Sequence, residues 1–195
     1  MSAAMTMRRK WFAPEVVQTS AMDCGPAALK CLLEGFGIRA SYGRLREACQ
    51  TGIDGTSIDT IEAVANRLGI AAEQVMLPPD QLFQGSNATL PALAVVQLPS
   101  GPAHFILVWR QAGHWLQVMD PAAGRRWVRR EEFLKELFRH ELSVPAADWR
   151  DWAAGDEYRD AVTQRLAALG VGQRAAAGFL ATALADDNWY SAAVL

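Results

Sequence analysis

The sequence predicts an α+β domain in which helices come first and an antiparallel sheet follows. Residues 24–69 contain three successive helix-start signals, and apolar side chains recur at helical spacing after each of them. Between residues 90 and 129, short apolar and β-branched runs alternate with tight turns. Strands joined by such short loops must pair antiparallel, so the second half is predicted to be a meander on which the helices pack.

The first two helices are defined by their starts and ends. Cys24-Gly25-Pro26 marks the start of the first helix, because proline is tolerated in the first turn. Residues 27–34 continue this helix, and Gly35 and Gly37 are expected to end it. Ser41 is a favourable N-cap for a short second helix that reaches Cys49.

A third helix is predicted after residues 54–57, where Asp-Gly-Thr-Ser forms a turn and supplies the cap. Its apolar stripe is predicted to consist of Ile58, Ile61, Ala65 and Leu68. Gly69 is expected to end it. Three helices therefore precede the first strong strand signal.

The remaining elements of the domain follow in order. Residues 15–18 are expected to be extended, 78–80 to form a turn or brief helix, and 131–140 to be helical. Strands are predicted at residues 71–76, 90–98, 104–110, 114–120 and 125–129. The last four are the strands of the meander.

The composition changes after residue 144. Residues 145–195 are rich in alanine and carry seven acidic side chains against four arginines, a net charge of −3. The predicted apolar stripes there are Tyr158, Val162, Leu166 and Leu169, then Phe179, Leu180, Ala183 and Leu184. We therefore expect a domain over residues 1–144 and a helical extension over 145–195. The sequence leaves open what the extension packs on, and whether the chain stands alone or is part of something longer.

Composition limits the possible partners. The 195 residues have a formal net charge of −2, which gives no reason to expect nucleic acid or an anionic membrane as a partner. The one basic cluster, interpreted as the solvated face of a hairpin, is Arg125, Arg126, Arg129 and Arg130. No window approaches the roughly 20 apolar residues of a membrane span. Three cysteines without paired spacing favour a reduced, cytoplasmic setting.

The sequence predicts no cofactor and no metal site. The cysteines and histidines show neither CxxC nor HxxxH spacing, which metal sites commonly use. The phosphate-binding pattern GxxxxGK[ST] is also absent. The chemistry is therefore expected to depend on side chains alone.

Cys24 is the candidate nucleophile. It lies where a loop turns into a helix, and the positive end of the helix dipole lowers the pKa of a thiol there. Gln18 lies six residues earlier, close enough for its amide to donate a hydrogen bond to an oxygen of the group that Cys24 attacks. The pair indicates a thiol nucleophile with an oxyanion donor.

A thiol nucleophile also needs a base and a group that orients the base. His104 opens one predicted strand and Asp120 closes the next. If these strands pair through a three-residue turn at 111–113, residue 104 lies opposite 120 and residue 110 opposite 114. That register puts the carboxylate beside the imidazole. Papain-like cysteine hydrolases share the resulting chain order of Gln, Cys, His and Asp.

The other cysteines and histidines have structural interpretations. Cys31 and Cys49 fall inside helical stripes and are interpreted as small buried hydrophobes. His114 is interpreted as an exposed strand residue, and His140 as a residue in the last turn of a helix. Asp23 is expected to cap the first helix from outside.

Several spaced motifs together resemble the C39 peptidases, which are papain-like domains that cleave double-glycine leader peptides from bacteriocin and other ribosomal peptide precursors. The resemblance covers about residues 16–133. Its motifs are Gln18-x5-Cys24, Asp23-Cys24-Gly25-Pro26-Ala27, Tyr42 with Leu45, Asp54-Gly55-Thr56-Ser57, Gly101-Pro102-Ala103-His104-Phe105 and Asp120-Pro121.

The resemblance implies a papain-like fold and a role for each site residue. Cys24 would be the nucleophile, His104 the general base and then acid, Asp120 the orienting residue and Gln18 the oxyanion donor. The implied activity is removal of the leader from a bacteriocin-type or lanthipeptide-type precursor after a Gly-Gly-type motif. A narrow cleft would admit only small residues before the scissile bond, and the leader would dock as a helix in an apolar groove.

The resemblance also implies partners and a location. The partners would be the precursor peptide and an ABC exporter, in cis or in trans, at the cytoplasmic face of the inner membrane. Most C39 domains are followed directly by a membrane domain, whereas residues 145–195 here are alanine-rich and helical. Two other functions remain open. One is a non-catalytic C39-like domain that binds a substrate peptide for export, and the other is a papain-like acyl transfer such as ligation or deamidation.

Overall fold

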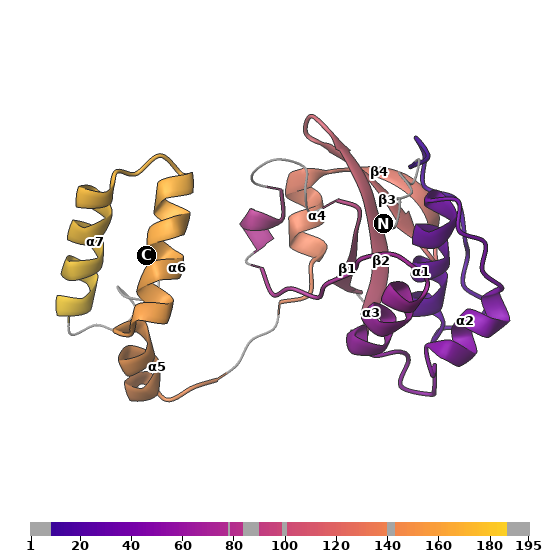
Figure 1. Cartoon of the computed structure of the whole chain (residues 1–195), viewed down its shortest axis with the longest axis horizontal. Helices are drawn as coiled ribbons and strands as arrows, with labels where there is room; N and C mark the ends of the chain where they lie inside the picture. Colours follow the sequence, from indigo (N-terminus) through magenta and orange to yellow (C-terminus); the bar gives the residue numbers. More distant parts are fainter. Residues whose placement is uncertain (1–8, 78, 84–89, 99–100, 140–142, 187–195) are drawn as a thin grey trace, which may run out of the picture. The chain divides into compact units, whose positions relative to one another are not determined.

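The computed structural model describes residues 9–77, 79–83, 90–98, 101–139 and 143–186. Contacts within the chain define two units, Met1–Arg139 and His140–Leu195. The first unit combines helices with a four-stranded sheet, and the second contains helices α5 to α7 in the part that is described (Figure 1). The α+β prediction is confirmed for the first unit, with helices before sheet along the chain.

The three predicted helices are present as α1 (Cys24–Gly35), α2 (Tyr42–Ala48) and α3 (Ile58–Arg67). Ser41 and Ser57 occupy the predicted N-cap positions of α2 and α3, and Ser57 Oγ accepts a hydrogen bond from the Thr60 backbone N–H at 3.2 Å. In α3 the buried residues are Ile61, Val64 and Ala65, whereas Ile58 and Leu68 are more than a third exposed. The predicted stripe is therefore correct at its centre and wrong at its two ends.

Helix α1 is buried along most of its length, because it packs on the sheet and is flanked by α2 and α3 (Figure 1). Its small residues allow this close packing on several sides. A Cβ added at Gly35 would overlap the indole ring of Trp109 in β2, so only glycine fits there. A Cβ at Gly25 would lie 3.1 Å from side-chain atoms of both Thr56 and Ile61, which press against the start of α1.

The sheet is an antiparallel meander in the order β1-β2-β3-β4, as predicted. Its strands are β1 (Ala92–Gln97), β2 (Ala103–Ala112), β3 (Trp115–Asp120) and β4 (Gly124–Arg129). A short 3-10 helix, η1 (Pro79–Phe83), precedes the sheet, and α4 (Arg130–Glu136) follows it. The predicted strand at 71–76 is absent from the structure. The predicted helix at 131–140 ends early, at Glu136, and His140 lies outside the described residues.

The predicted register of β2 and β3 is wrong, because the loop is shorter than expected. Ala112 pairs with Trp115, so Gly113 and His114 form a two-residue turn, and His114 is not opposite Arg110. Gly113 has φ +59, a conformation that two-residue hairpin turns require and glycine adopts readily.

A β-bulge then changes the register again. Arg110 pairs with Gln117, whereas Val108 pairs with Val118, so Trp109 is the extra residue on β2. Continuing the register beyond the Leu107–Met119 pair places Asp120 opposite Ile106, two residues from His104. His104 and Asp120 are therefore diagonal neighbours on one face of the sheet, within reach of a long side chain.

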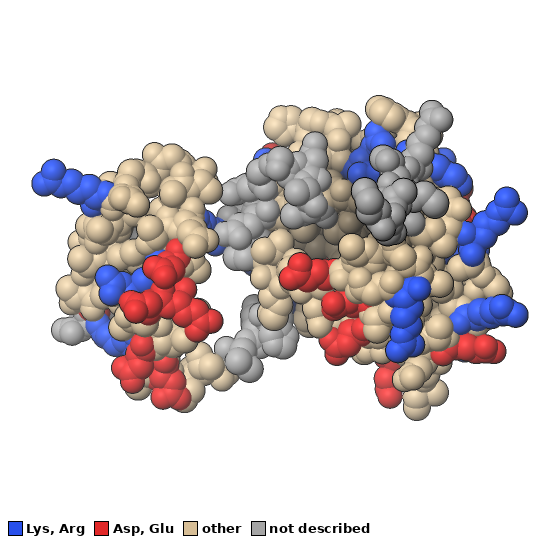
Figure 2. Space-filling model, viewed as in Figure 1, with Lys and Arg blue, Asp and Glu red and all other residues tan. Residues whose placement is uncertain are grey.

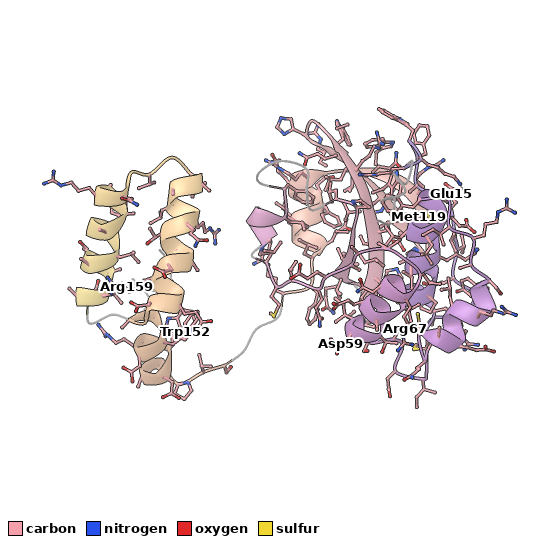
Figure 3. The ribbon with its side chains drawn as sticks, viewed as in Figure 1. Glu15, Asp59, Arg67, Met119, Trp152 and Arg159 are labelled. Atoms are coloured by element: carbon pink, nitrogen blue, oxygen red, sulfur yellow. The ribbon has the colours of Figure 1, made fainter. Side chains whose placement is uncertain are left out.

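The two faces of the sheet build two separate cores. On one face, Leu107, Trp109 and Met119 pack with α1 and its neighbouring helices, and Figure 3 labels Met119 on this side. On the other face, Ile106, Val108, Leu116 and Val118 pack with Phe133 of α4. The alternation along the strands is what a sheet covered on both faces requires.

Residues 9–18 form no regular secondary structure and are hydrogen-bonded to several parts of the first unit. The Lys10 N–H donates to the Gly35 carbonyl at 2.9 Å, and the Ala13 N–H donates to Gln117 Oε1 at 2.8 Å. The Gln18 N–H donates to the Pro121 carbonyl at 2.9 Å. This segment therefore ties the end of α1, the centre of β3 and the turn after β3 to the loop that precedes Cys24.

The second unit consists of α5 (Ala146–Ala153), α6 (Asp156–Ala168) and α7 (Gln173–Ala185). Trp149, Trp152 and Tyr158 form an aromatic cluster with ring centroids 4.9 to 5.8 Å apart. Val162 and Leu180 of the predicted stripes are buried, whereas Leu169 and Phe179 are at least half exposed. Acidic side chains gather over α5 and α6 in the face shown in Figure 2. Among the described helices, none has the length and apolar character needed to cross a bilayer.

Replacing Gly35 by alanine is expected to destabilise the domain, because the new methyl group would force the Trp109 ring or α1 to move. Overpacking of this kind costs about 1–3 kcal/mol. Gly43→Ala in α2 is the matched control, since a Cβ there meets nothing within 4 Å. Alanine also has the higher helix propensity, so Gly43→Ala should be neutral or slightly stabilising. Urea unfolding of both variants measures the difference, and equal midpoints would contradict this account of the Gly35 contact.

Candidate active site

The described residues bring Cys24, His104 and Asp120 together at one end of the sheet. Cys24 is the first residue of α1, as its proline-containing start predicts, and it is 8% exposed. His104 lies near the start of β2 and is 3% exposed. Asp120 is the last residue of β3. The nucleophile therefore comes from the helical half of the domain, and the other two residues come from the sheet.

The imidazole of His104 is held by the carboxylate of Asp120. The His104 Nε2 and Asp120 Oδ1 atoms are 2.8 Å apart. Asp120 Oδ1 also accepts a hydrogen bond from the Ala122 N–H at 2.8 Å, which fixes the carboxylate in the turn after β3. Because Nε2 is engaged by Asp120, the ring presents its other nitrogen, Nδ1, to the Cys24 thiol.

The Cys24 thiol and the His104 imidazole lie close enough for each to change the pKa of the other. Burial raises the pKa of the Cys24 thiol, but hydrogen bonds from His104 and from the Phe105 and Gly25 N–H groups, with the charge of His104, lower the pKa below its ordinary value overall. Burial lowers the pKa of His104, but the hydrogen bonds and charges of Asp120 and Cys24 raise it to about 9. The lowered pKa of the thiol and the raised pKa of the imidazole both favour a thiolate beside an imidazolium.

The pKa of Asp120 is lowered as well. Burial raises its pKa, but this is outweighed by the hydrogen bond to His104, the Ala122 N–H and the charges of His104 and Arg126. The carboxylate therefore stays ionised when His104 is protonated, so that it both orients and stabilises the imidazolium.

Gln18 is placed beside this site by its backbone. Its N–H bonds to the Pro121 carbonyl, and Pro121 directly follows Asp120. The buried Oε1 atom of Gln18 has no hydrogen-bond partner among the described residues. The side-chain amide is thus not committed to bonds that hold the fold together, and it lies in the loop that leads to Cys24.

Asp23 does not cap α1 with its side chain, contrary to the sequence-based expectation. It occupies the N-cap position, but its carboxylate makes no cap hydrogen bond and is 1% exposed. Oδ2 accepts from Thr19 Oγ1 and Oδ1 accepts from Arg46 Nε, both at 2.9 Å. Arg46 was not among the predicted site residues, because nothing in the sequence distinguishes it from an ordinary surface arginine on a short helix.

The other cysteines are buried away from this chemistry. Cys31 donates to the Pro14 carbonyl at 2.8 Å, and burial raises its pKa to about 12. Burial also raises the pKa of Cys49 to about 11. Across the part of the chain that is described, no three His, Cys, Asp or Glu side chains are grouped so that they could hold a metal ion.

The sequence of this part of the chain matches a known family. The sequence model described as the Peptidase C39 family matches residues 13–144. The chain belongs to the peptidase C39 family. The match covers the helices and sheet of the first unit, including Gln18, Cys24, His104 and Asp120.

Relatives of this C39 chain support the family and its fold. The lactococcin-G-processing and transport ATP-binding protein LagD of Lactococcus lactis is 30% identical over 121 residues, which is 62% of this chain and 17% of LagD. The peptidase domain of Streptococcus ComA has a TM-score of 0.55 at 26% identity, over 64% of this chain and 92% of that domain.

A third comparison supports the fold alone. A double glycine motif protease from an AMS/PCAT transporter, solved with its leader peptide, has a TM-score of 0.56 at 23% identity. It covers 68% of this chain and 89% of the solved chain. The papain-like α+β fold of the C39 domain is thus shown, and the chain spans less than a fifth of the length of LagD.

The pH dependence of Cys24 alkylation should report the thiolate–imidazolium pair. At a pH below the lowered pKa of Cys24 the thiolate is protonated, and at a pH above about 9 the imidazolium of His104 loses its charge. Iodoacetamide should therefore modify Cys24 at lower pH than it modifies an ordinary thiol, while Cys31 and Cys49 react slowly. His104→Ala removes the hydrogen bond and the charge but leaves burial, so the thiol pKa should rise to at least its ordinary value of about 8.5.

His114→Ala is the control for this experiment, because His114 is exposed in the turn between β2 and β3. It should alkylate like the parent protein. Peptide mass spectrometry follows each cysteine separately. An unchanged pKa of Cys24 in His104→Ala would show that the imidazole does not stabilise the thiolate.

Proposed function

We propose that this C39 domain is a cysteine endopeptidase that removes the leader from a ribosomally made precursor peptide after a Gly-Gly-type motif. The observation that carries the proposal is the His104–Asp120 hydrogen bond of 2.8 Å beside the buried Cys24 thiol, whose pKa His104 lowers. A domain that only binds peptides has no need for a buried thiol with a lowered pKa beside a protonated histidine. The names of the bacteriocin-processing relatives suggest the substrate class.

The geometry supports a two-step acyl transfer. The Cys24 thiolate attacks the carbonyl carbon before the scissile bond, and the amide of Gln18 donates a hydrogen bond to the oxyanion that forms. The imidazolium of His104 then protonates the leaving amine as the C–N bond breaks and a thioester remains on Cys24. Neutral His104 next removes a proton from water, which attacks the thioester and releases the leader with a free carboxylate.

Burial of the nucleophile supports selection of small residues. Because Cys24 is only 8% exposed, a peptide carbonyl reaches its sulfur only where the substrate chain is thin. Side chains at the two positions before the scissile bond would overlap the walls formed by the surrounding loops, whereas glycine would fit. The proposal therefore links the restricted access to the Gly-Gly-type motif.

The partners and location of the activity are part of the same proposal. LagD is named as a processing and transport protein, and the match covers 17% of its length. We propose that this chain acts on its precursor at the cytoplasmic face of a membrane, with an ABC exporter supplied in cis or in trans. Its substrate would be a precursor peptide with a helical leader.

Cys24→Ala is expected to abolish cleavage, because no other described group near His104 can form the thioester. The assay follows a synthetic precursor with a helical leader and a Gly-Gly motif by mass spectrometry. Replacing the second glycine of the precursor by valine should block cleavage by the parent enzyme through steric overlap. Cys49→Ala is the matched cysteine control and should retain cleavage. A Cys24→Ala enzyme that cuts as fast as the parent would disprove the mechanism.

Gln18→Ala is expected to lower kcat by about 10²–10³-fold with little change in KM, because an oxyanion donor acts in the transition state. Gln18→Glu replaces the amide donor by an acceptor and should be at least as slow. Gln50→Ala, which changes an exposed glutamine two residues after the end of α2, is the control. Loss confined to KM would assign Gln18 to substrate binding and remove it from the oxyanion site.

A further inference from the structure

The loop that carries both Gln18 and Cys24 is held from one side by helix α2. Thr19 follows Gln18 directly, and Asp23 precedes Cys24 directly. The Thr19 N–H donates to the Tyr42 hydroxyl oxygen at 3.3 Å, and Arg46 Nε donates to Asp23 Oδ1 at 2.9 Å. Each of the two proposed site residues in this loop thus has a neighbour bonded to α2.

The two α2 side chains are spaced to act together. Tyr42 and Arg46 are four residues apart, so they project from the same face of the helix. Leu45, between them in sequence, is buried and anchors α2 in the core beside α1. The Thr19 hydroxyl donates to Asp23 Oδ2 at 2.9 Å and so links the two ends of the loop to each other.

The burial of Asp23 makes its pairing with Arg46 important for the nucleophile. Its side chain is 1% exposed, whereas the Arg46 side chain is 52% exposed and can keep part of its guanidinium in water. A buried carboxylate next to Cys24 in sequence disfavours a thiolate unless its charge is balanced. Breaking such a pair by removing one partner leaves an uncompensated buried charge.

We propose that Arg46 and Tyr42 are positioning residues of the active site, with Arg46 holding and neutralising Asp23, which precedes Cys24 in the chain, and Tyr42 fixing Thr19, which follows Gln18. The proposal rests on the proposed peptidase function for its consequences in catalysis, but the contacts themselves do not depend on it. His104 from β2 is the charged group that acts directly on the Cys24 thiol, Asp120 at the end of β3 is bonded to His104, and the Asp23–Arg46 pair adjoins Cys24 in the sequence.

The test is a double-mutant cycle on the charges of Asp23 and Arg46, measured in the full chain. In Arg46→Gln, the unbalanced Asp23 carboxylate should raise the pKa of Cys24 by about one unit, as measured by the rate of iodoacetamide alkylation against pH. In the double variant Asp23→Asn/Arg46→Gln, the pKa should return to within about 0.3 units of the parent value. A purely structural role for the pair predicts the opposite, since the double variant would be at least as perturbed as the single one.

Arg44→Gln is the matched control, because it removes the same charge from an exposed position two residues away on α2. It should leave the pKa of Cys24 and precursor cleavage unchanged. Tyr42→Phe removes only the hydroxyl acceptor of Thr19. It should lower kcat by about 2- to 10-fold through Gln18, without moving the pKa of Cys24.

The outcomes separate this inference from the proposed function. If Arg46→Gln shifts the alkylation profile and the double variant restores it while no precursor is cleaved, the positioning inference holds and the peptidase proposal fails. If the parent cleaves precursor but Arg46→Gln and Arg44→Gln have the same pKa for Cys24, the positioning role of Arg46 is wrong. If Arg46→Gln loses its native circular dichroism spectrum, the kcat values of Asp23→Asn and Tyr42→Phe provide the test instead. Parent-like kcat in both would overturn the proposal.

Discussion

The geometry of the candidate site depends on one extra residue in strand β2. Directly opposite residues of two antiparallel strands lie on the same face of the sheet. Two residues that are not directly opposite share a face only when one of them is an even number of residues along its strand from the position opposite the other. Had the register next to the hairpin turn continued without the bulge, Asp120 would lie opposite Leu107 and on the face of the sheet that α1 covers. Trp109 shifts the register by one, so Asp120 shares its face with Ile106 and therefore with His104. The hydrogen bond between the two side chains follows from this shift.

The bulge is itself stabilised by packing. The Trp109 ring lies against Gly35 of α1, where no side chain fits, and its Nε1–H donates to the Lys10 carbonyl at 3.2 Å. The guanidinium of Arg9 stacks over the same ring with 4.5 Å between its carbon and the ring centroid. A large buried aromatic side chain contributes several kcal/mol of packing, so straightening β2 would be costly. The contacts that hold α1 on the sheet therefore also fix the register of His104 and Asp120.

Much of the fold could be predicted from sequence because local signals agree with it. The starts of α1, α2 and α3 depend on residues next to each helix, such as Pro26, Ser41 and Ser57, and the meander depends on short turns. The prediction of a strand at residues 71–76 was wrong, because the sequence of a short segment does not show whether a partner strand is available. The bulge at Trp109 has no local signal, since an extra residue becomes visible only when the partner strand is in place.

The candidate site was predicted for a reason that was partly incorrect. His104 and Asp120 were expected to be adjacent through a three-residue turn, whereas they are diagonal neighbours after a two-residue turn and a bulge. The prediction placed them on one face because the expected and observed registers differ by an even number of residues at this end of the sheet. The ion pair between Asp23 and Arg46 was not predictable. Sequence patterns place the Arg46 side chain in solvent, whereas it reaches the residue before α1.

The three cysteines show why the site needs both halves of the domain. Burial alone raises the pKa of a thiol, as it does for Cys31, to about 12, and for Cys49, to about 11. Cys24 is also buried, yet its pKa is lowered, because His104 and the Phe105 N–H stabilise the thiolate from β2. The start of α1 without the sheet would leave an ordinary thiol in water. A reactive thiolate therefore forms only when α1 has docked on the correctly registered sheet, which couples the chemistry of Cys24 to completion of the fold.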